Sequence, residues 1–374
     1  MMPALSRADT SILGRWWWSV DRVTLLALAA LIAIGYVLAL AAMPGMTMRF
    51  SSPDTQAMIR QILFLALGGG VMLALSMLSL RQVKLAALGL GILFFLLTAF
   101  TLVHGVEVDG AHRWISLPGF TLQPSELLRP GFIVISAWLI AESRRTPGFP
   151  GKRAALGVFL LVAFVLRAQP DIGMTFLFTL VVFVQFYLDG IDLKWVWLAA
   201  LAVVVASLAA FLFISHVHSR VMLFLHPTKN SAYQALTALS AFGNGGLFGR
   251  GPGEGQVKQY LPDARADFVF AVAGEEFGLL FCAFIILVFA CIVVRAMLRL
   301  LQERDPFVLL AAGGLVAGFG LQAFVNMASS MSLIPTKGMT LPFISYGGSS
   351  ILGMSVQMGF LLALTRKRHQ GELL

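Results

Sequence analysis

The chain consists largely of long, uninterrupted apolar stretches separated by short segments rich in charge, Gly or Pro. An α-helix needs about 20 apolar residues to cross the roughly 30 Å of hydrocarbon in a bilayer. Strands of a membrane barrel would instead alternate apolar and polar residues over about ten positions. The pattern therefore predicts an all-α polytopic membrane protein with about ten transmembrane helices. The predicted spans lie near residues 22–42, 58–79, 84–104, 126–142, 155–170, 172–188, 194–215, 268–294, 306–330 and 349–365.

The composition excludes the common classes of soluble protein. Of the 374 residues, 58% are hydrophobic and only 12% are charged. A soluble protein carries about 45–50% apolar and about 25% charged residues. A disordered chain carries fewer apolar residues than a soluble protein does. The two cysteines, Cys282 and Cys291, fall within one predicted span, which predicts packing residues rather than a disulfide or a zinc site. We expect one membrane domain over residues 1–374.

The distribution of Lys and Arg predicts the orientation. Ten crossings place both termini on one side, and most of the 27 basic residues fall in the termini and in the connections on that side. By the positive-inside rule the N-terminal segment 1–21 and the tail 366–374 are cytoplasmic, and the long loop 215–267 faces outward. The net charge of +9 is largely explained in this way. A nucleic-acid partner is not expected, because no basic segment is interleaved with aromatic residues.

Several polar residues stand where a membrane disfavours them. Ser125 and Glu126 open the predicted helix 126–142, where an N-cap and a favourable dipole interaction would explain them without any further role. Arg129 lies three residues further along the same helix face. An unpaired cation at that depth costs roughly 2.5–3.5 kcal/mol. Arg129 is therefore predicted to face a polar cavity lined by protein.

Acidic residues mark two further helix starts. Asp171 and Asp267 each precede a predicted helix, and either of them could act only as an N-cap. Glu275 and Glu276 follow Asp267 by about two turns and cannot both face lipid. The sequence thus predicts a polar path leading into the protein from the outer end of this helix.

Two segments are predicted to have irregular backbone. Seven of the thirteen residues 243–255 are Gly, which suggests that this backbone approaches another part of the molecule closely. Residues 334–350 contain two Pro and three Gly, so they break the helical pattern and add a cation, Lys337. Irregular backbone at membrane depth is tolerated only where it lines a cavity or is buried in protein.

Cations and carboxylates therefore collect around helix ends on the predicted outer face. Arg holds phosphate through paired hydrogen bonds and Lys acts as a point charge, so this set suits a phosphorylated lipid. Diphosphate leaves as an anion, so a transferase acting on it needs cations and one base but no general acid. An inverting glycosyl transfer is thus chemically feasible. The set comprises Arg113, Arg129, Arg220, Lys337, Glu126 and Asp267.

Five motifs in order resemble one family. The chain is similar over residues 21–368 to the SEDS (shape, elongation, division, sporulation) proteins, ten-helix bacterial peptidoglycan polymerases. Lys337 in its Pro-Thr-Lys-Gly string resembles the division member more than the elongation member. The motifs are GAHRWISLPGFTLQPSE, QPDIGM, GNGGLFGRGPGEG, LPDARADFVFAVAGEEFG and PTKGMTLPFISYGGSS.

The resemblance implies polymerisation of lipid II into β-1,4-linked glycan at the outer leaflet of the bacterial inner membrane, at the division septum. Asp267 matches the family's essential acid and would be the base that deprotonates the acceptor 4-hydroxyl. The implied partners are lipid II, a class B penicillin-binding protein transpeptidase, other divisome membrane proteins and membrane lipid. The implied substrate-binding residues are Arg113, Gln123, Ser125, Glu126, Arg129, Arg220, Lys337 and Ser345.

Alternatives stay open at the level of sequence. A lipid II flippase would use the same cationic outer cavity and intramembrane carboxylates without any chemistry. A non-catalytic scaffold for a transpeptidase and an elongation-type polymerase are further alternatives. A divalent cation, Mg²⁺ or Mn²⁺, that assists the diphosphate is compatible with the sequence but is not identified by it.

Overall fold

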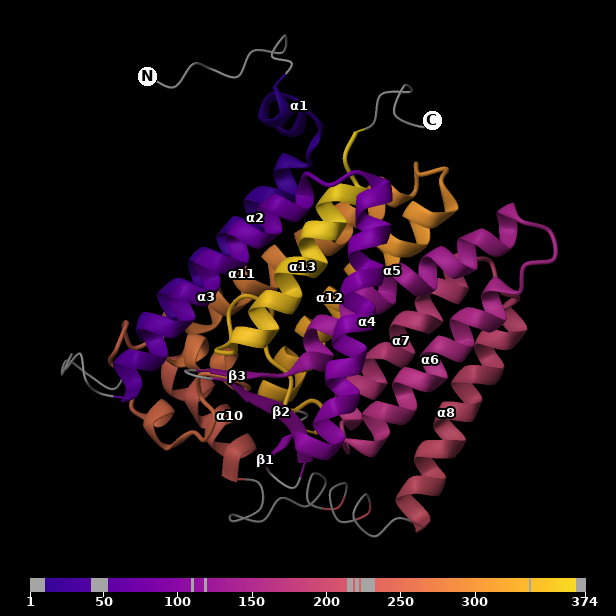
Figure 1. Ribbon diagram of the computed structural model, residues 1–374. Coiled ribbons are helices and arrows are strands. Elements are labelled where there is room, and N and C mark those ends of the chain that lie inside the picture. Colours follow the sequence, from indigo (N-terminus) through magenta and orange to yellow (C-terminus); the bar gives the residue numbers. More distant parts are fainter. Residues whose placement is uncertain are drawn as a thin grey trace.

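A computed structural model describes residues 11–41, 53–108, 111–117, 120–213, 233–335 and 338–367, together with His218 and Met222. The described chain is mostly helical, and three short strands form one antiparallel sheet in the order β1-β2-β3 (Figure 1). The strands are β1 (Val106–Val108), β2 (Ala111–Leu117) and β3 (Phe120–Leu122). The helices are α1 (Ile12–Ser19), α2 (Arg22–Ala41), α3 (Pro53–Ser76), α4 (Leu80–His104), α5 (Pro124–Arg145), α6 (Gly151–Ala168), α7 (Ile172–Leu188), α8 (Leu193–Phe213), α10 (Tyr233–Gly245), the 3-10 helix η1 (Val257–Tyr260), α11 (Val269–Leu300), α12 (Pro306–Ser330) and α13 (Gly348–Leu364).

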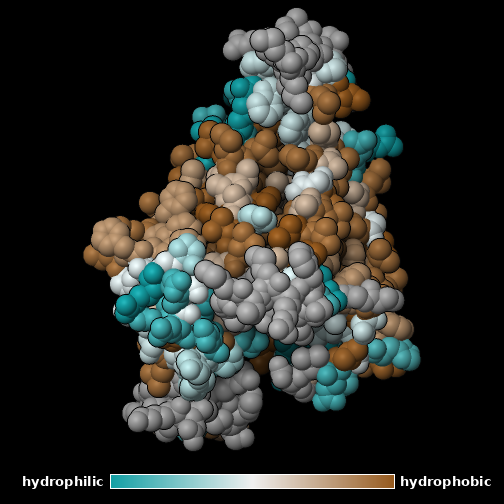
Figure 2. All heavy atoms as spheres, turned by 90° about the vertical axis from the view of Figure 1, so that its left-hand side faces the viewer, coloured by the Kyte–Doolittle hydropathy of each residue, from teal (hydrophilic) through white to brown (hydrophobic). Residues whose placement is uncertain are grey.

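A helix coincides with each of the ten predicted spans. By length and composition, five of the described helices could cross a membrane, and α7 and α13 are shorter apolar helices. A broad band of hydrophobic side chains crosses the face shown in Figure 2, with hydrophilic residues gathered beyond it. The multi-pass helical architecture is confirmed, while the number of ten crossings stays a prediction. The five helices are α2, the Thr55–Ser76 part of α3, α4, α11 and α12.

The core of the molecule is formed by α5, α12 and α13. In the most apolar 18-residue stretch of α12, 78% of the residues are buried, against 22–39% in the corresponding stretches of α2, α3, α4 and α11. The closest helix neighbours are α4 with α5 and α3 with α13, and α12 packs against both α5 and α7. In Figure 1, α12 and α13 lie between α2, α3 and α11 on one side and α4 to α8 on the other. The outer helices therefore expose apolar faces while the central three are enclosed by protein.

Helices α4 and α5 approach each other through glycine. A Cβ atom added at Gly131 would lie 2.8 Å from the amide nitrogen of Gly91 and 2.9 Å from the carbonyl oxygen of Ala87. Small residues that let two backbones touch are characteristic of helix packing in membranes, where lipid gives no hydrophobic drive for association. This crossing carries the sheet on one of its ends, because β1 follows α4 and β3 precedes α5.

Helix α11 is broken at Gly278, whose φ is 83° and ψ 175°. The glycine-rich segment occupies the break. The amides of Arg250 and Gly251 donate to the carbonyls of Glu275 and Glu276 at 2.9 and 3.0 Å, and the Leu279 amide donates to the Gly246 carbonyl at 3.0 Å.

The close approach predicted for residues 243–255 is thus confirmed, and it is made to α11. A Cβ atom at Gly245 would overlap the carbonyl oxygen of Gly274.

The structure corrects two predicted N-caps and confirms a third. Ser125 is not an N-cap: α5 begins at Pro124, with Gln123 at the cap position. A proline fits the first helical position because its φ is preset and it lacks the N–H that would be unpaired there. Asp267 is not an N-cap either, since Phe268 holds that position before α11. Asp171 does cap α7, accepting from the Met174 amide at 3.1 Å.

Two further features differ from the sequence analysis. Between the predicted spans 84–104 and 126–142, where no element was expected, β1, β2 and β3 form the small sheet in which β2 pairs with both of its neighbours. Cys282 is buried as expected, but Cys291 is exposed, so it is not a packing residue within this chain. Of the predicted 215–267 loop, residues 215–217, 219–221 and 223–232 lie outside the described residues.

The close contact between α4 and α5 predicts that a larger side chain at Gly131 destabilises the protein. Gly131→Ala should lower the free energy of unfolding by about 1–3 kcal/mol, because its methyl group meets backbone atoms that cannot rotate away. Gly157→Ala in α6 is the matched control, since a Cβ there has open space within 4 Å. Alanine is the better helix former, so the control should be neutral or slightly stabilising. Thermal unfolding in detergent compares the two variants, and equal midpoints would contradict the proposed contact.

Candidate functional site

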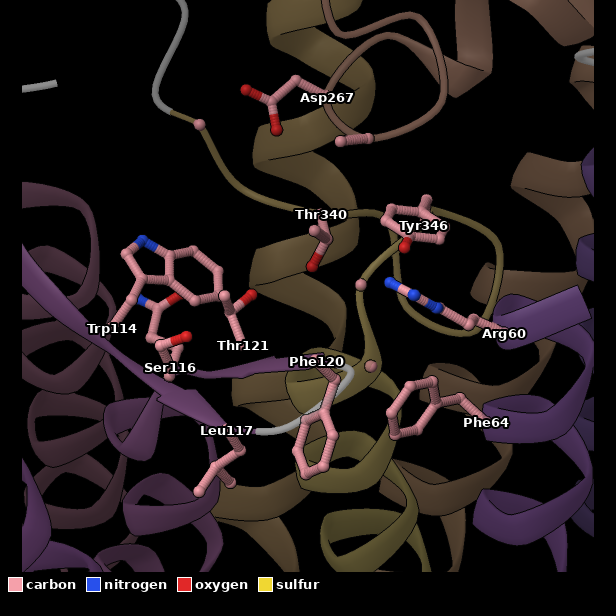
Figure 3. A pocket seen from close by; sticks show the side chains of 15 residues that line it. Arg60, Phe64, Trp114, Ser116, Leu117, Phe120, Thr121, Asp267, Thr340 and Tyr346 are labelled. Carbon is pink, nitrogen blue, oxygen red and sulfur yellow. The ribbon is translucent and has the colours of Figure 1, made fainter. Parts of the chain in front are cut away.

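A cavity of about 520 Å³ lies where α3, the sheet and two irregular segments meet. The segments are residues 261–268, which lead into α11, and residues 338–347, which lead into α13. Figure 3 shows the Asp267 side chain at one end of this space, with Trp114 on one side and Arg60 and Tyr346 on the other. We refer to it as the Asp267 cavity.

Helix α12 holds the two irregular segments together. The Asn326 side-chain amide donates to the carbonyl oxygen of Asp267 at 2.9 Å and to that of Met339 at 2.6 Å. The Ser330 hydroxyl also donates to the Asp267 carbonyl, at 3.2 Å. Asn326 is fully buried, so one amide fixes the backbone on both sides of the cavity. The backbone position of Asp267 is therefore set by a core helix and not by its own loop alone.

Ser345 and Tyr346 add a second set of bonds between the segments. The Ser345 hydroxyl donates to the Ala266 carbonyl and accepts from the Leu341 amide at 2.7 Å. The Tyr346 amide donates to the Arg265 carbonyl at 2.8 Å. The predicted role of Ser345 was substrate binding, but the structure uses its hydroxyl to join these segments.

Asp267 carries an unusual carboxyl group. Burial, and to a lesser extent the negative charge of Asp263, raises its pKa to about 6. Its side chain makes no N-cap bond and points into the cavity, where a Cβ atom added at Gly338 would lie 3.5 Å from one carboxylate oxygen. A carboxylate with a pKa near the working pH can take a proton from a hydroxyl and still be ionised in most molecules. The geometry thus suits a general base.

The cavity has a cation that the sequence analysis did not single out. Arg60, near the start of α3, extends its guanidinium group into the cavity beside Tyr346 (Figure 3). It belongs to none of the quoted motifs, so motif reading missed it. The available signal was an arginine at the beginning of an apolar span on the predicted outer face. Apolar side chains complete the same wall, where the rings of Phe64 and Phe120 pack edge to face at 5.8 Å.

Two of the predicted site residues line the cavity, Asp267 and Gln123. The backbone amide of Gln123 donates to the Ser349 hydroxyl at 2.9 Å. The Gln123 side-chain amide donates to the Ser125 hydroxyl and to the Asp171 carboxylate, at 3.3 Å each. Ser125 itself is buried.

Arg113 has a bracing role between chain segments. Its guanidinium donates to the carbonyls of Gln169 and Pro170 at 3.2 and 2.6 Å and lies 3.8 Å from the Asp171 carboxylate. Arg113 therefore ties β2 to the connection between α6 and α7. It does not line the Asp267 cavity.

Glu126 and Arg129 lie deeper, inside the core. Arg129 has no exposed surface; it donates to Gln357 at 3.0 Å and to Gln322, and it pairs with Glu126 at 3.4 Å. The prediction of a polar cavity around Arg129 is wrong, because protein amides and a carboxylate satisfy the cation directly. The network still reaches the Asp267 cavity, since the Gln322 amide donates to the carbonyl of Thr340, which lines it, at 2.9 Å.

Glu275 and Glu276, which were predicted to mark a polar path into the protein, instead bind the glycine-rich segment and the residues that follow it. Glu275 accepts hydrogen bonds from the Asn244 side chain and from the three successive amides of residues 256–258, each at 2.8 Å. Glu276 forms a buried ion pair with Lys258. Both carboxylates are thus used to hold backbone against α11.

Arg220 and Lys337 lie outside the described residues, although Gly338, next to Lys337, lines the cavity. Within the described ranges, no three His, Cys, Asp or Glu side chains gather in a way that could hold a metal ion. The charged groups that the structure places in the Asp267 cavity are one carboxylate and one guanidinium.

Comparison with known proteins places the chain among related sequences. The model of the FtsW/RodA/SpoVE family, described as cell cycle protein, matches residues 21–370. A protein of Caulobacter vibrioides named probable peptidoglycan glycosyltransferase FtsW is 41% identical over 98% of this chain and 94% of its own length. A Geobacter sulfurreducens protein of the same name is 34% identical over 93% of this chain and 95% of its own length.

Solved structures show the same fold. A chain of a peptidoglycan synthase complex that coordinates polymerization and crosslinking aligns with a TM-score of 0.76 and 26% identity, over 93% of this chain and 98% of that chain. The rod shape determining protein RodA of Thermus thermophilus aligns with a TM-score of 0.67 and 26% identity, over 93% of this chain and 97% of that chain.

The raised pKa of Asp267 predicts a pH-dependent stability difference. An acid whose pKa is higher in the folded than in the unfolded protein lowers stability as pH rises from the unfolded pKa to the folded one, and the loss is complete above the folded pKa. Asp267→Asn should therefore raise the free energy of unfolding by about 1–3 kcal/mol at pH 7.5, and the gain should disappear by pH 4. Thermal unfolding of both proteins across this range tests the prediction. A difference that does not change with pH would contradict it.

The two hydrogen bonds that the Asn326 side chain donates predict that its removal destabilises the protein. Asn326→Ala should destabilise the protein by about 1–3 kcal/mol, because the Met339 carbonyl oxygen loses its Asn326 donor and the Asp267 carbonyl keeps only the bond from Ser330. Ser240→Ala is the control, since that exposed hydroxyl donates only to a carbonyl of its own helix, α10. Hydrogen exchange should show faster exchange at residues 261–268 and 338–347 in Asn326→Ala alone. Unchanged protection there would refute the role of Asn326.

Proposed function

The chain belongs to the FtsW/RodA/SpoVE family of cell cycle proteins, and we infer from this that it is a peptidoglycan glycosyltransferase of cell division. The two relatives named peptidoglycan glycosyltransferase FtsW are similar to this chain over nearly their whole length. The observation in the structure that supports the activity is the Asp267 carboxylate, which points into a cavity that also contains a guanidinium group.

The substrate we propose is lipid II, the disaccharide-pentapeptide carried on undecaprenyl diphosphate. The Asp267 cavity has a polar part, with Asp267, Arg60 and Thr340, and an apolar part, with Phe64 and Phe120. Such a division suits a molecule with a sugar diphosphate at one end and a lipid at the other. Trp114 and Tyr346 add flat ring surfaces, against which the apolar faces of sugar rings can pack.

In the proposed mechanism Asp267 acts as the general base. It takes the proton from the acceptor 4-hydroxyl as that oxygen forms a bond to the anomeric carbon of the donor. The bond from this carbon to the diphosphate breaks, and undecaprenyl diphosphate leaves as an anion. Attack opposite the leaving group inverts the anomeric centre and gives a β-1,4 linkage. The diphosphate needs no proton from an acid, because it is already a stable anion.

Cations stabilise the charge that grows on the diphosphate. Arg60 lies in the cavity and can hold phosphate oxygens through paired hydrogen bonds. Arg220 and Lys337 are proposed to contribute to the same task. A divalent cation fits the donor set only with help from the substrate, because Mg²⁺ sites of this type combine one or two carboxylates with phosphate oxygens. Phosphate oxygens of the substrate would supply most ligands of such an ion, because Asp267, the one carboxylate of the described lining, is needed free as the base; the ion would neutralise diphosphate charge.

We further propose that the protein works beside a class B penicillin-binding protein in the bacterial inner membrane at the septum. Support comes from the fold it shares with a chain of a synthase complex in which polymerization and crosslinking are coordinated. Glycan strands become useful wall material only after their peptides are cross-linked. A transpeptidase and other divisome membrane proteins are therefore the expected partners.

An assay with purified protein and labelled lipid II tests the activity. Asp267→Asn should lower the rate of strand formation by about 100-fold or more, because the neutral amide cannot accept the proton. The wild-type rate should also fall as pH drops below about 6, where Asp267 becomes protonated.

Asp263→Asn is the matched control, as it removes the same charge four residues away at a position whose φ of 53° asparagine tolerates. Because Asp263 raises the pKa of Asp267, this variant should polymerise and keep its rate to lower pH than the wild type does. Normal polymerisation by Asp267→Asn would overturn the mechanism. Movement of lipid II across vesicles by a protein that forms no strands would favour a flippase.

A further inference from the structure

A second cavity, of about 760 Å³, lies at the end of the molecule opposite the Asp267 cavity. It is formed by α1, the turn between α3 and α4, the end of α5, the start of α12 and the residues that follow α13. In Figure 1, α1 and the end of α13 lie far from the three strands. Six basic side chains line it, so we call it the basic cavity. They are Arg15, Arg81, Lys84, Arg145, Arg366 and Lys367.

Among the described residues that line the basic cavity, basic side chains outnumber acidic ones. Asp305 is the one acidic residue of its lining, and its carboxylate is already paired with Arg145 at 3.0 Å and accepts the Phe307 amide at 2.9 Å. Arg15 and Arg81 are exposed, and the described part of the chain offers neither of them a carboxylate. Within the described lining, six basic side chains thus stand beside one carboxylate, and like charges gathered in this way repel one another unless an anion is present.

The fold builds this cluster from distant segments. Arg366 donates to the Ser19 hydroxyl at 2.9 Å and to the Met77 carbonyl at 3.0 Å. The Trp16 indole donates to the Ser76 hydroxyl at 2.8 Å and so fixes α1 against the end of α3. The positive-inside rule requires basic residues near helix ends, but it does not require them to converge on one hollow. The convergence calls for a separate explanation.

The walls of the basic cavity are partly apolar. Ile12, Met77, Leu78 and Leu80 line it together with the basic groups. The ammonium group of Lys84 lies 4.3 Å from the centre of the Phe307 ring, a cation–π contact at the edge of the membrane-embedded core. A ligand that fits must therefore present an anion to the hollow and hydrocarbon to the apolar wall.

We propose that the basic cavity binds the phosphate-bearing headgroup of an anionic phospholipid. Basic pockets between transmembrane helices take such headgroups, and each basic residue near the membrane surface adds to the attraction. The lipid would neutralise the excess charge and stabilise the packing of α1 and the C-terminal residues on the helix bundle. This inference stands on the charge and shape of the basic cavity and is independent of the proposed function.

A lipid titration of delipidated protein in non-ionic detergent, followed by native mass spectrometry, tests the proposal. The probes are phosphatidylglycerol, phosphatidylcholine with the same acyl chains, and inorganic phosphate. The test variant is Arg15→Gln with Arg81→Gln. The control is Arg153→Gln with Lys194→Gln, which removes two exposed charges near the starts of α6 and α8, outside the basic cavity.

Wild-type protein should bind phosphatidylglycerol more tightly than phosphatidylcholine. The test variant should lose about 10- to 30-fold in affinity for phosphatidylglycerol, and the control should stay within about twofold. Thermal unfolding without added lipid should be similar for the two variants, since none of the four residues is buried. Equal binding of the two lipids, equal losses in both variants, or inorganic phosphate binding as tightly as the lipid would each overturn the proposal.

Discussion

The Asp267 cavity depends on one buried amide. Asn326 donates to the carbonyls of Asp267 and Met339, so a residue of the central helix α12 joins two segments that have no regular structure of their own. Inside a membrane protein such segments cannot rely on water, and their backbone groups need partners within the chain. Asn326 meets that need and at the same time sets the distance between the base and the opposite wall of the cavity.

The same requirement explains the break in α11. At Gly278 the helix leaves amides and carbonyls unpaired, and the glycine-rich segment supplies partners for them. Glycine is needed there because the two backbones touch. The buried carboxylate of Glu275 then holds the following amides of residues 256–258. The outer end of α11, which carries Asp267 just before it, is thereby held by the segment that precedes it in the chain.

Sequence reasoning predicted the kind of chemistry at the site better than it predicted the residues that line it. Asp267 is one of two acids in the predicted cationic set, and its choice as the base rests on the resemblance to the SEDS family. Arg129 was correctly marked as an ion that cannot face lipid, but Gln322, Gln357 and Glu126 satisfy it in place of a substrate cavity. Arg60 was missed, because nothing in its neighbourhood along the chain shows that α3 places it beside the segments before α11 and α13.

The hydrophobic pattern alone determined the helical class and the location of the ten long helices, because an apolar run of this length has one stable conformation in lipid. It also indicated where the backbone must be irregular, from Gly and Pro. Which polar groups meet was decided only by the tertiary structure. Helix pairing depends on the shapes of small contact surfaces, such as the one at Gly91 and Gly131, and these do not appear in a one-dimensional pattern.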